Sequence, residues 1–256
     1  MPRTTPRPAG APCWIDLMTS DVDGALAFYG ELFGWEFEDA SNDEGGSYHL
    51  ASLGGAVVAG VMAKQEAEFP DSWNVYLASS DIAATARRVE AAGGTIVVPV
   101  MQIDTSGSMM VVADPAGAVV SVWQSADFAG TELLAEHGTP IWFESLSKDY
   151  ERSLAFYRDA FDWELHTLSD TDQFRYTTLG ESEVARAGIM DAASLAPEIP
   201  SMWQIYFASD DVDATAARLL ALGGTEVTAA HDTPYGHLGA YTDPTGAFFC
   251  LSSIDS

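Results

Sequence analysis

The stretch that decides the fold is PCWIDLMTSDVDGALAFYGELFGW, residues 12–35, because it returns at residues 140–163 as PIWFESLSKDYERSLAFYRDAFDW. Two further pairs extend the repeat. WNVYLASSDIAATARRVEAAGGT (73–95) is matched by WQIYFASDDVDATAARLLALGGT (203–225), and DPAGAVVSVW (114–123) by DPTGAFFCLS (243–252). The repeat predicts two homologous domains, residues 12–124 and 140–254. Residues 1–11 are expected to form a flexible lead-in, and residues 125–139 a linker with room for one short helix.

Each half contains the same order of elements twice. In the first unit a strand-like run, WIDLMTS, precedes Asp21, which suits a helix N-cap, and Phe28, Tyr29 and Leu32 follow at helical spacing on one face. The second unit opens with WNVYLASS, and its helix begins after Asp81 and ends at two glycines. Strand-like runs follow both helices, and DPAG fits a type I turn. Each half is therefore predicted to be βαβββ-βαβββ, an α+β fold.

Composition and charge limit the possible functions. The chain has 256 residues, is 47% hydrophobic and carries a formal charge of −27, with 38 acidic and 11 basic residues. It can bury an ordinary core, but its charge would repel a phosphate backbone, so nucleic acid is not an expected partner. No apolar run approaches the roughly 20 residues of a membrane span, and no secretory signal is recognised, so a cytoplasmic location without membrane contact is predicted. Two cysteines without paired spacing are expected to be buried thiols.

These motifs together resemble the vicinal oxygen chelate superfamily: a strand, an Asp, a helix ending in FY...LFGW, then Y...SDI, GG and DPAG. That superfamily includes glyoxalase I, bleomycin and fosfomycin resistance proteins, and extradiol dioxygenases. Two such domains in tandem with Trp in the first strand look like actinobacterial proteins labelled glyoxalase-like or hydroxylase. The resemblance covers nearly the whole chain outside the lead-in and linker. It implies two tandem domains, each built of two βαβββ modules that form a cup-shaped sheet.

The resemblance also implies where metal ligands would stand. Metal-using members place one ligand seven residues before each helix-opening acid and a Glu seven residues after the Asp of the DPxG turn. This rule selects Trp14, Asn74 and Ser121 in the first half, and Trp142, Gln204 and Cys250 in the second. Neither set makes a metal triad, because Trp offers no lone pair and first-row divalent metals prefer imidazole, carboxylate or thiolate. No cofactor is predicted, and a divalent metal with displaced ligands remains an alternative.

Strand alternation predicts which other residues face each cup, since residues two apart share a face. Each cup should hold an aromatic wall, one carboxylate, one amide and one phenol: Trp14, Asp16, Asn74 and Tyr76 in the first half, and Trp142, Glu144, Gln204 and Tyr206 in the second. These groups could orient a ligand in an apolar pocket, and the carboxylate could act as a general base. Alternatively, Asp16 and Glu144 only bond the neighbouring amide and Tyr, and the tryptophans fill the cups.

The second half adds histidines that the first half lacks. His231 and His237 flank an expected hairpin loop near the cup mouth, together with Tyr235. A His beside Glu144 could transfer protons, so Glu144, His231, His237 and Asp16 are the catalytic candidates. Tyr235 and Cys250 join the ligand-binding candidates. The alternative is that these loop histidines are solvent-exposed and have no role in chemistry.

Three classes of function remain open. The first is a metal-free pocket protein that holds a small apolar or aromatic metabolite, by sequestration or by acid-base chemistry. The second is a metal-dependent lyase, isomerase, hydroxylase or dioxygenase with ligands drawn from His231, His237, Glu144 and Cys250. The third is a regulatory protein with filled cups. A monomer or a homodimer is expected, since four modules in one chain can complete two cups.

Overall fold

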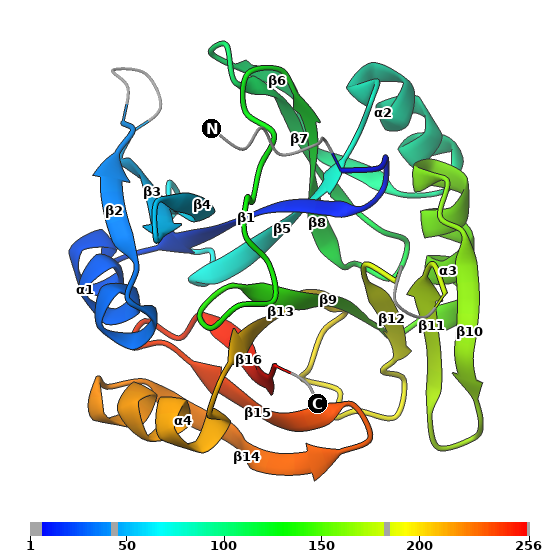
Figure 1. Cartoon of the computed structure of the whole chain (residues 1–256). Helices are drawn as coiled ribbons and strands as arrows, with labels where there is room; N and C mark the ends of the chain where they lie inside the picture. Colours follow the sequence, from blue (N-terminus) through cyan, green and yellow to red (C-terminus); the bar gives the residue numbers. More distant parts are fainter. Residues whose placement is uncertain (1–6, 42–45, 182–184, 255–256) are drawn as a thin grey trace. The chain divides into compact units, whose positions relative to one another are not determined.

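The computed structural model describes residues 7–41, 46–181 and 185–254. Within these residues the chain forms four helices: α1 (Val22–Phe33), α2 (Ile82–Ala91), α3 (Tyr150–Phe161) and α4 (Val212–Ala221) (Figure 1). The helices alternate with groups of strands, and the strands form two eight-stranded sheets. Residues 1–6 of the expected lead-in lie outside the described part of the chain.

The strands of the first half form a sheet in the order β2-β3-β4-β1-β5-β8-β7-β6. Strand β1 pairs with β4 in parallel, as β5 does with β8, while hairpins join the neighbouring strands within each module. This is the predicted pair of βαβββ modules. The strands are β1 (Pro12–Thr19), β2 (Glu36–Asp39), β3 (Tyr48–Leu53), β4 (Ala56–Ala63), β5 (Ser72–Ala78), β6 (Thr95–Ile103), β7 (Gly107–Ala113) and β8 (Val119–Ser125).

The second half repeats this topology as β10-β11-β12-β9-β13-β16-β15-β14. The parallel pairs are β9 with β12 and β13 with β16, so the α+β prediction of four βαβββ modules is confirmed. The strands are β9 (Pro140–Ser147), β10 (Leu165–Asp170), β11 (Arg175–Leu179), β12 (Gly188–Asp191), β13 (Met202–Ser209), β14 (Thr225–Thr233), β15 (Gly236–Thr242) and β16 (Phe248–Ser253).

Local sequence explains where the helices begin. The carboxylates of Asp21, Asp81 and Asp211 each accept the backbone N–H three residues later, as N-cap residues do. In α2 the predicted end is also found, because Gly93 adopts a φ of 84° just beyond the helix. The helix starts predicted from Asp21 and Asp81 are therefore confirmed.

The expected short helix is absent from the linker, which lies wholly within the described residues. Residues 126–139 run in non-helical conformations, with backbone hydrogen bonds to other segments. Ala126 N–H donates to the carbonyl of Ser106 (2.8 Å), and Glu132 N–H donates to that of Val57 (2.7 Å). In these bonds, backbone groups of the linker pair with neighbouring strands and turns. Such groups are therefore satisfied without a helix.

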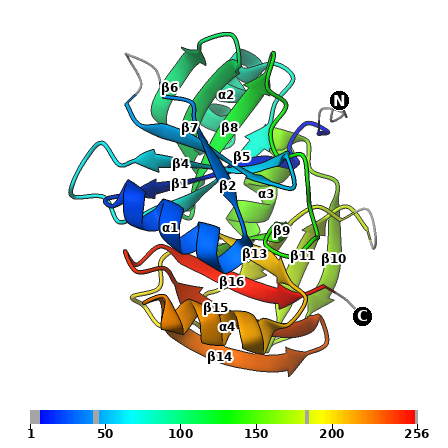
Figure 2. The ribbon, with the colours of Figure 1, turned by 60° about the vertical axis from the view of Figure 1, so that its left-hand side comes forward.

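Packing divides the chain into two compact units, each made of segments from both halves. Unit 1 takes its described residues from Met1–Trp14, Val75–Gly130 and Phe143–Gln204, and it contains α2 packed on α3 (Figure 1). Unit 2 takes its described residues from Ile15–Asn74, Thr131–Trp142 and Ile205–Ser256, and it contains α1 near α4 (Figure 2). In each unit, a module of the first half thus shares its core with a module of the second.

The core of unit 2 is a cluster of aromatic rings. Phe207 of β13 is fully buried, and its ring centroid lies 5.2 Å from that of Phe33 and 5.3 Å from that of Trp73. Trp35 and Phe249 complete the cluster around it. Since Phe33, Trp35 and Trp73 come from the first half and Phe207 and Phe249 from the second, neither half alone supplies this core.

Buried hydrogen bonds explain why the FY and DPxG motifs recur. In unit 2 the Tyr29 hydroxyl donates to Asp243 Oδ2 (3.1 Å) and accepts the indole N–H of Trp73 (3.0 Å). In unit 1 the Tyr157 hydroxyl accepts the indole N–H of Trp203 (2.8 Å). Burial raises the pKa of both phenols well above the ordinary value of 10.0, so both remain protonated. The tyrosine of FY thus bonds residues that are distant in sequence.

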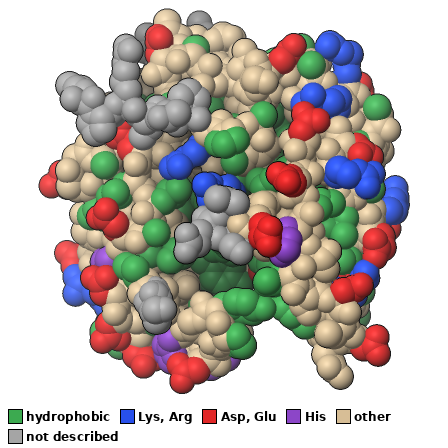
Figure 3. Space-filling view, turned by 45° about the vertical axis from the view of Figure 1, so that its right-hand side comes forward, with side chains coloured by type: hydrophobic (Ala, Val, Ile, Leu, Met, Phe, Trp, Pro, Cys, Tyr) green, Lys and Arg blue, Asp and Glu red, His purple; other side chains and the backbone are tan. Residues whose placement is uncertain are grey.

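The surface reflects the acidic composition. Asp and Glu side chains are spread over the face shown in Figure 3, and Lys and Arg gather at fewer places on it. In the part of the chain that the structure describes, no helix has the length and apolar character needed to cross a membrane.

Candidate functional site

A buried carboxylate of β9 is at the centre of the candidate site in unit 1. Glu144 is 6% exposed, and its Oε1 accepts a hydrogen bond from Gln204 Nε2 on β13 (2.6 Å). The amide lies where the resemblance places the second metal ligand of this half. Gln204 donates its N–H to the Glu144 carboxylate, so the two residues predicted to share a cup are hydrogen-bonded to each other.

A tyrosine completes this arrangement. The phenol of Tyr176 on β11 fills the space above Gly188 of β12, where any Cβ atom would overlap with the ring. Gly188 is the register partner of Glu144 in the parallel β9–β12 pair, so the phenol lies next to the carboxylate strand. We call Glu144, Gln204 and Tyr176 the Glu144 trio.

Unit 2 contains the same arrangement in its first-half segment. Asn74 Nδ2 donates to Asp16 Oδ1 (2.9 Å), and the hydroxyl of Tyr48 lies 3.5 Å from Asp16 Oδ2. Tyr48 covers Gly60, which is the register partner of Asp16 in the β1–β4 pair. We call Asp16, Asn74 and Tyr48 the Asp16 trio.

Sequence reasoning missed the two tyrosines although a signal was present. Tyr48 and Tyr176 occupy equivalent places in the repeat, and so do Gly60 and Gly188. A repeated Tyr on one strand and a repeated Gly on the next is the pattern of a ring packed over a glycine. The strand alternation rule instead selected Tyr76 and Tyr206, which lie on β5 and β13 beside the amides.

The residues at the predicted metal positions include one ligand of the kinds that first-row divalent metals prefer, the thiol of Cys250. Ser121 and Cys250 are the register partners of Tyr76 and Tyr206, so the third position lies on β8 and β16 as expected. However, the sets contain two indoles and two amides, and both amides donate N–H to a carboxylate. Neither set contains an imidazole or a carboxylate. Among the described residues, no group of three His, Cys, Asp or Glu side chains is placed to hold a metal.

The linker covers the tryptophan of the first half. Phe128 stands edge-on against Trp14, with ring centroids 4.8 Å apart, and its carbonyl accepts the indole N–H of Trp123 (3.0 Å). Trp14 is only 3% exposed as a result. By contrast, Trp142 and Tyr206 of the second half both keep part of their surface exposed.

The histidine candidates lie on the β14–β15 hairpin in unit 2. His231 is exposed, and its Nδ1 lies 3.0 Å from the carbonyl of Ala229. His237 bonds two surface carboxylates, Asp232 through Nδ1 (2.7 Å) and Asp213 through Nε2 (3.2 Å). These carboxylates raise the pKa of the imidazole, and Tyr235 at the hairpin turn is 57% exposed. The proton-transfer role of either His beside Glu144 therefore stays a prediction.

The ion pairs of His237 lead to a pH-dependent prediction. Because the folded-state pKa is raised above the unfolded value of about 6.5, protonated His237 stabilises the fold below that pH, and the contribution is lost as pH rises through the folded-state pKa. His237→Gln should therefore lower the Tm slightly at pH 5.5 and leave it unchanged at pH 9. Calorimetry of both proteins at the two pH values tests this. An equal loss at pH 9 would contradict it.

Both cysteines are buried free thiols, as predicted. Burial raises the pKa of the Cys13 thiol to about 12, so it is not a nucleophile at neutral pH. Cys250 lies on β16 at 5% exposure, opposite Tyr206 of β13.

Known proteins resemble the chain over nearly its whole length. The family model described as Glyoxalase/Bleomycin resistance protein/Dioxygenase superfamily matches residues 13–122 and 141–251. CFP32 of Mycobacterium tuberculosis (strain CDC 1551 / Oshkosh), named as a glyoxylase, is 35% identical over 98% of this chain and 97% of its own. The anthracycline biosynthesis protein DnrV of Streptomyces peucetius is 32% identical over 96% of this chain and 94% of its own.

Solved structures show the same fold at low identity. The Mn(II)-bound glyoxalase from Novosphingobium aromaticivorans superimposes with a TM-score of 0.66 at 19% identity, covering 96% of this chain and 83% of that one. The 2,3-dioxygenase LapB from Pseudomonas sp. KL28 superimposes with a TM-score of 0.68 at 10% identity, covering 97% and 93%.

Proposed function

The chain belongs to the Glyoxalase/Bleomycin resistance protein/Dioxygenase superfamily, and from that premise we propose that it binds a small apolar or aromatic metabolite at the Glu144 trio without a metal. The observation that carries the proposal is the 2.6 Å hydrogen bond between Gln204 and the buried carboxylate of Glu144. This bond holds Glu144 beside Gln204, which stands at the position where a metal-using relative would present its second ligand. The carboxylate is then the group that meets the bound molecule.

The trio supplies complementary hydrogen-bonding groups. An ionised carboxylate has about four acceptor sites, so Glu144 can accept from a ligand O–H or N–H while it holds the Gln204 amide. The Tyr176 phenol adds a further polar group over Gly188, the register partner of Glu144. At 6% exposure these bonds form in a low-dielectric environment, where they are stronger than in water.

The same groups support acid-base chemistry as an extension of binding. Glu144 can take a proton from a carbon next to a carbonyl group, as a general base does. This would be an isomerase- or lyase-type step. Sequestration needs only the binding geometry, so binding is proposed first and turnover second.

Two further observations support an aromatic ligand and the second-half trio. The relative DnrV is named for anthracycline biosynthesis, and anthracyclines have a flat aromatic core. In addition, Phe128 of the linker packs on Trp14 of β1, while Trp142 of β9 is partly exposed. Strand β9 carries Glu144, so we place the ligand at this trio and assign a structural role to the Asp16 trio.

A binding experiment with matched variants tests this proposal. The probe is 1,8-dihydroxyanthraquinone, titrated calorimetrically into wild type, Glu144→Gln and Asp16→Asn after treatment with EDTA. Loss of a charged hydrogen-bond acceptor should weaken binding to Glu144→Gln by about tenfold or more, while Asp16→Asn should bind within about twofold of wild type. Binding that disappears with EDTA and returns with Mn(II) would instead support the metal-dependent alternative. Equal binding by all three proteins would remove Glu144 from the site.

A further inference from the structure

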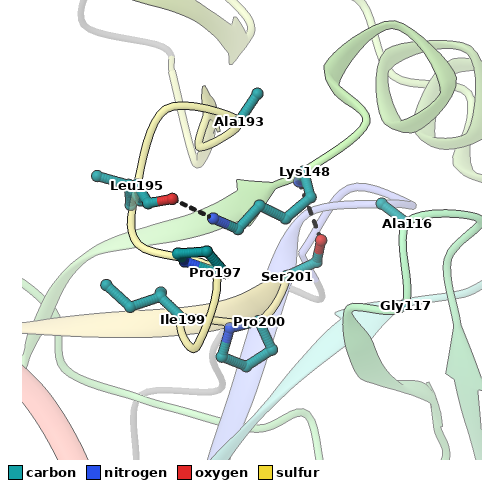
Figure 4. Close-up of a pocket in the computed structure, with 9 residues that line it drawn as sticks. All are labelled: Ala116, Gly117, Lys148, Ala193, Leu195, Pro197, Ile199, Pro200 and Ser201. Carbon is teal, nitrogen blue, oxygen red and sulfur yellow. Dashed lines mark hydrogen bonds between the residues drawn. The ribbon is translucent and has the colours of Figure 1, made fainter.

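A cavity of about 470 Å³ lies beyond the carboxyl end of β9 within unit 1 (Figure 4). It lies between the turn that follows Asp114 and the loop from β12 to β13. One side chain lining it, Lys148, is charged. The lining residues are Ala116, Gly117, Lys148, Ala193, Leu195, Pro197, Ile199, Pro200 and Ser201.

Lys148 extends across this cavity and is held by neutral groups. Its Nζ donates to the carbonyl oxygens of Leu195 (2.9 Å) and Ala196 (3.1 Å). Its backbone N–H donates to the hydroxyl of Ser201 (3.0 Å). In the described part of the chain, no carboxylate lies within 4.0 Å of Lys148 Nζ, although the protein has 38 acidic residues.

The equivalent place in the first half, in unit 2, contains a carboxylate instead of a cation. Ser20 occupies the position of Lys148 in the repeat, and Asp71 occupies that of Ser201. Asp71 accepts the backbone N–H of Ser20 (2.9 Å) and is neutralised by Lys64 (2.7 Å). The repeat therefore shows a carboxylate with its cation in one half, and a cation without a carboxylate in the other.

We infer that the cavity binds a small-molecule carboxylate with an apolar or aromatic body, whose acid group pairs with Lys148. An ammonium group has three donors, so Nζ can donate to a ligand carboxylate in addition to the two carbonyls. Leu195, Pro197 and Ile199 supply the apolar wall for the body of the ligand. Because the protein as a whole repels anions at a charge of −27, the ammonium group of Lys148 favours acid binding by offsetting that repulsion locally.

This site is separate from the Glu144 trio. Lys148 follows Glu144 by four residues along an extended strand, which places their Cα atoms about 13 Å apart. The inference therefore does not rest on the proposed function.

The experiment uses 2-naphthoate as the probe and neutral 2-naphthamide as its matched analogue. NMR titration of the intact protein should shift the backbone amides of Gly117 and Ser201 with naphthoate, and naphthamide should bind about tenfold more weakly. Lys148→Met should reduce naphthoate affinity about tenfold. Ser201→Asp recreates the carboxylate of the first half beside an intact Lys148, and it should reduce affinity by a similar factor.

Control variants keep the test decisive. Lys64→Met removes the cation that neutralises Asp71 in the first half, and it should bind naphthoate as wild type does. The inference is overturned if naphthoate leaves the amides of Gly117 and Ser201 unshifted. It is also overturned if naphthamide binds as tightly as naphthoate, or if Ser201→Asp retains wild-type affinity. If Lys148→Met disturbs the loop, Ser201→Asp still tests the inference, because it leaves Lys148 intact.

Discussion

Phe207→Ala is expected to destabilise the protein by about 3–5 kcal/mol, the usual range for removing a fully buried aromatic ring. Phe207 has no exposed surface and contacts the rings of Phe33, Trp35 and Trp73 of the first half. Its removal leaves a cavity between segments from the two halves, and rigid rings around it cannot easily collapse to fill the space. In this variant, unit 2 should unfold at a lower denaturant concentration than unit 1.

The chain offers a matched control for this substitution. Phe69 is 54% exposed in the loop before β5, so Phe69→Ala should change the free energy of unfolding by no more than about 0.5 kcal/mol. Chemical denaturation followed by tryptophan fluorescence measures both variants. If Phe207→Ala costs no more than Phe69→Ala, the shared aromatic core of unit 2 is not what stabilises the fold.

Gly130→Ala is expected to have the second-largest effect and to lower the free energy of unfolding by about 3 kcal/mol. Gly130 adopts a φ of 105°, which L side chains avoid. A Cβ atom there would also overlap with the carbonyl oxygen of Cys13 on β1, and a strand carbonyl cannot move aside as a side chain can. The variant should push the linker off β1 and expose Trp14, which Phe128 of the same linker covers.

Gly246→Ala separates the two contributions of that substitution. Gly246 has a similar φ of 97°, but a Cβ atom there would meet no atom within 4 Å. It should therefore show the conformational cost alone, about 1–2 kcal/mol. Thermal unfolding gives the free energy of unfolding of both variants, and the difference between the two values measures the packing of the linker against β1. A similar loss in both would mean that the linker moves away without cost.

Much of the local structure could be predicted because its causes are local. Asp21 and Asp81 cap helices through backbone N–H groups three residues away, and Gly93 ends α2 through its own backbone conformation. Strand alternation also brought Glu144 to Gln204 and Asp16 to Asn74, since residues on one face of neighbouring strands meet. These predictions needed only the order of elements and the resemblance to a known fold.

The contacts that could not be predicted join distant segments through side-chain shape. The neighbours of Tyr176 do not indicate that it lies over Gly188, for which the repeated Tyr and Gly were the one signal, and nothing near Phe128 indicates that it covers Trp14. Both depend on how a turn or linker lies in space. His237 shows the same limit, since its partners Asp232 and Asp213 come from a hairpin and a helix.

The amino-acid sequence by itself determined the repeat, the four βαβββ modules and the family, because periodicity, caps and turn residues act within a few positions of each other. Only the tertiary structure decided which modules share a core. The apolar helix faces of the four modules are alike, so any two could pack together by pattern alone. Ring shapes around Phe207 and the buried bond from Tyr29 to Asp243 select the pairing across the two halves, since these contacts form between residues far apart in the chain.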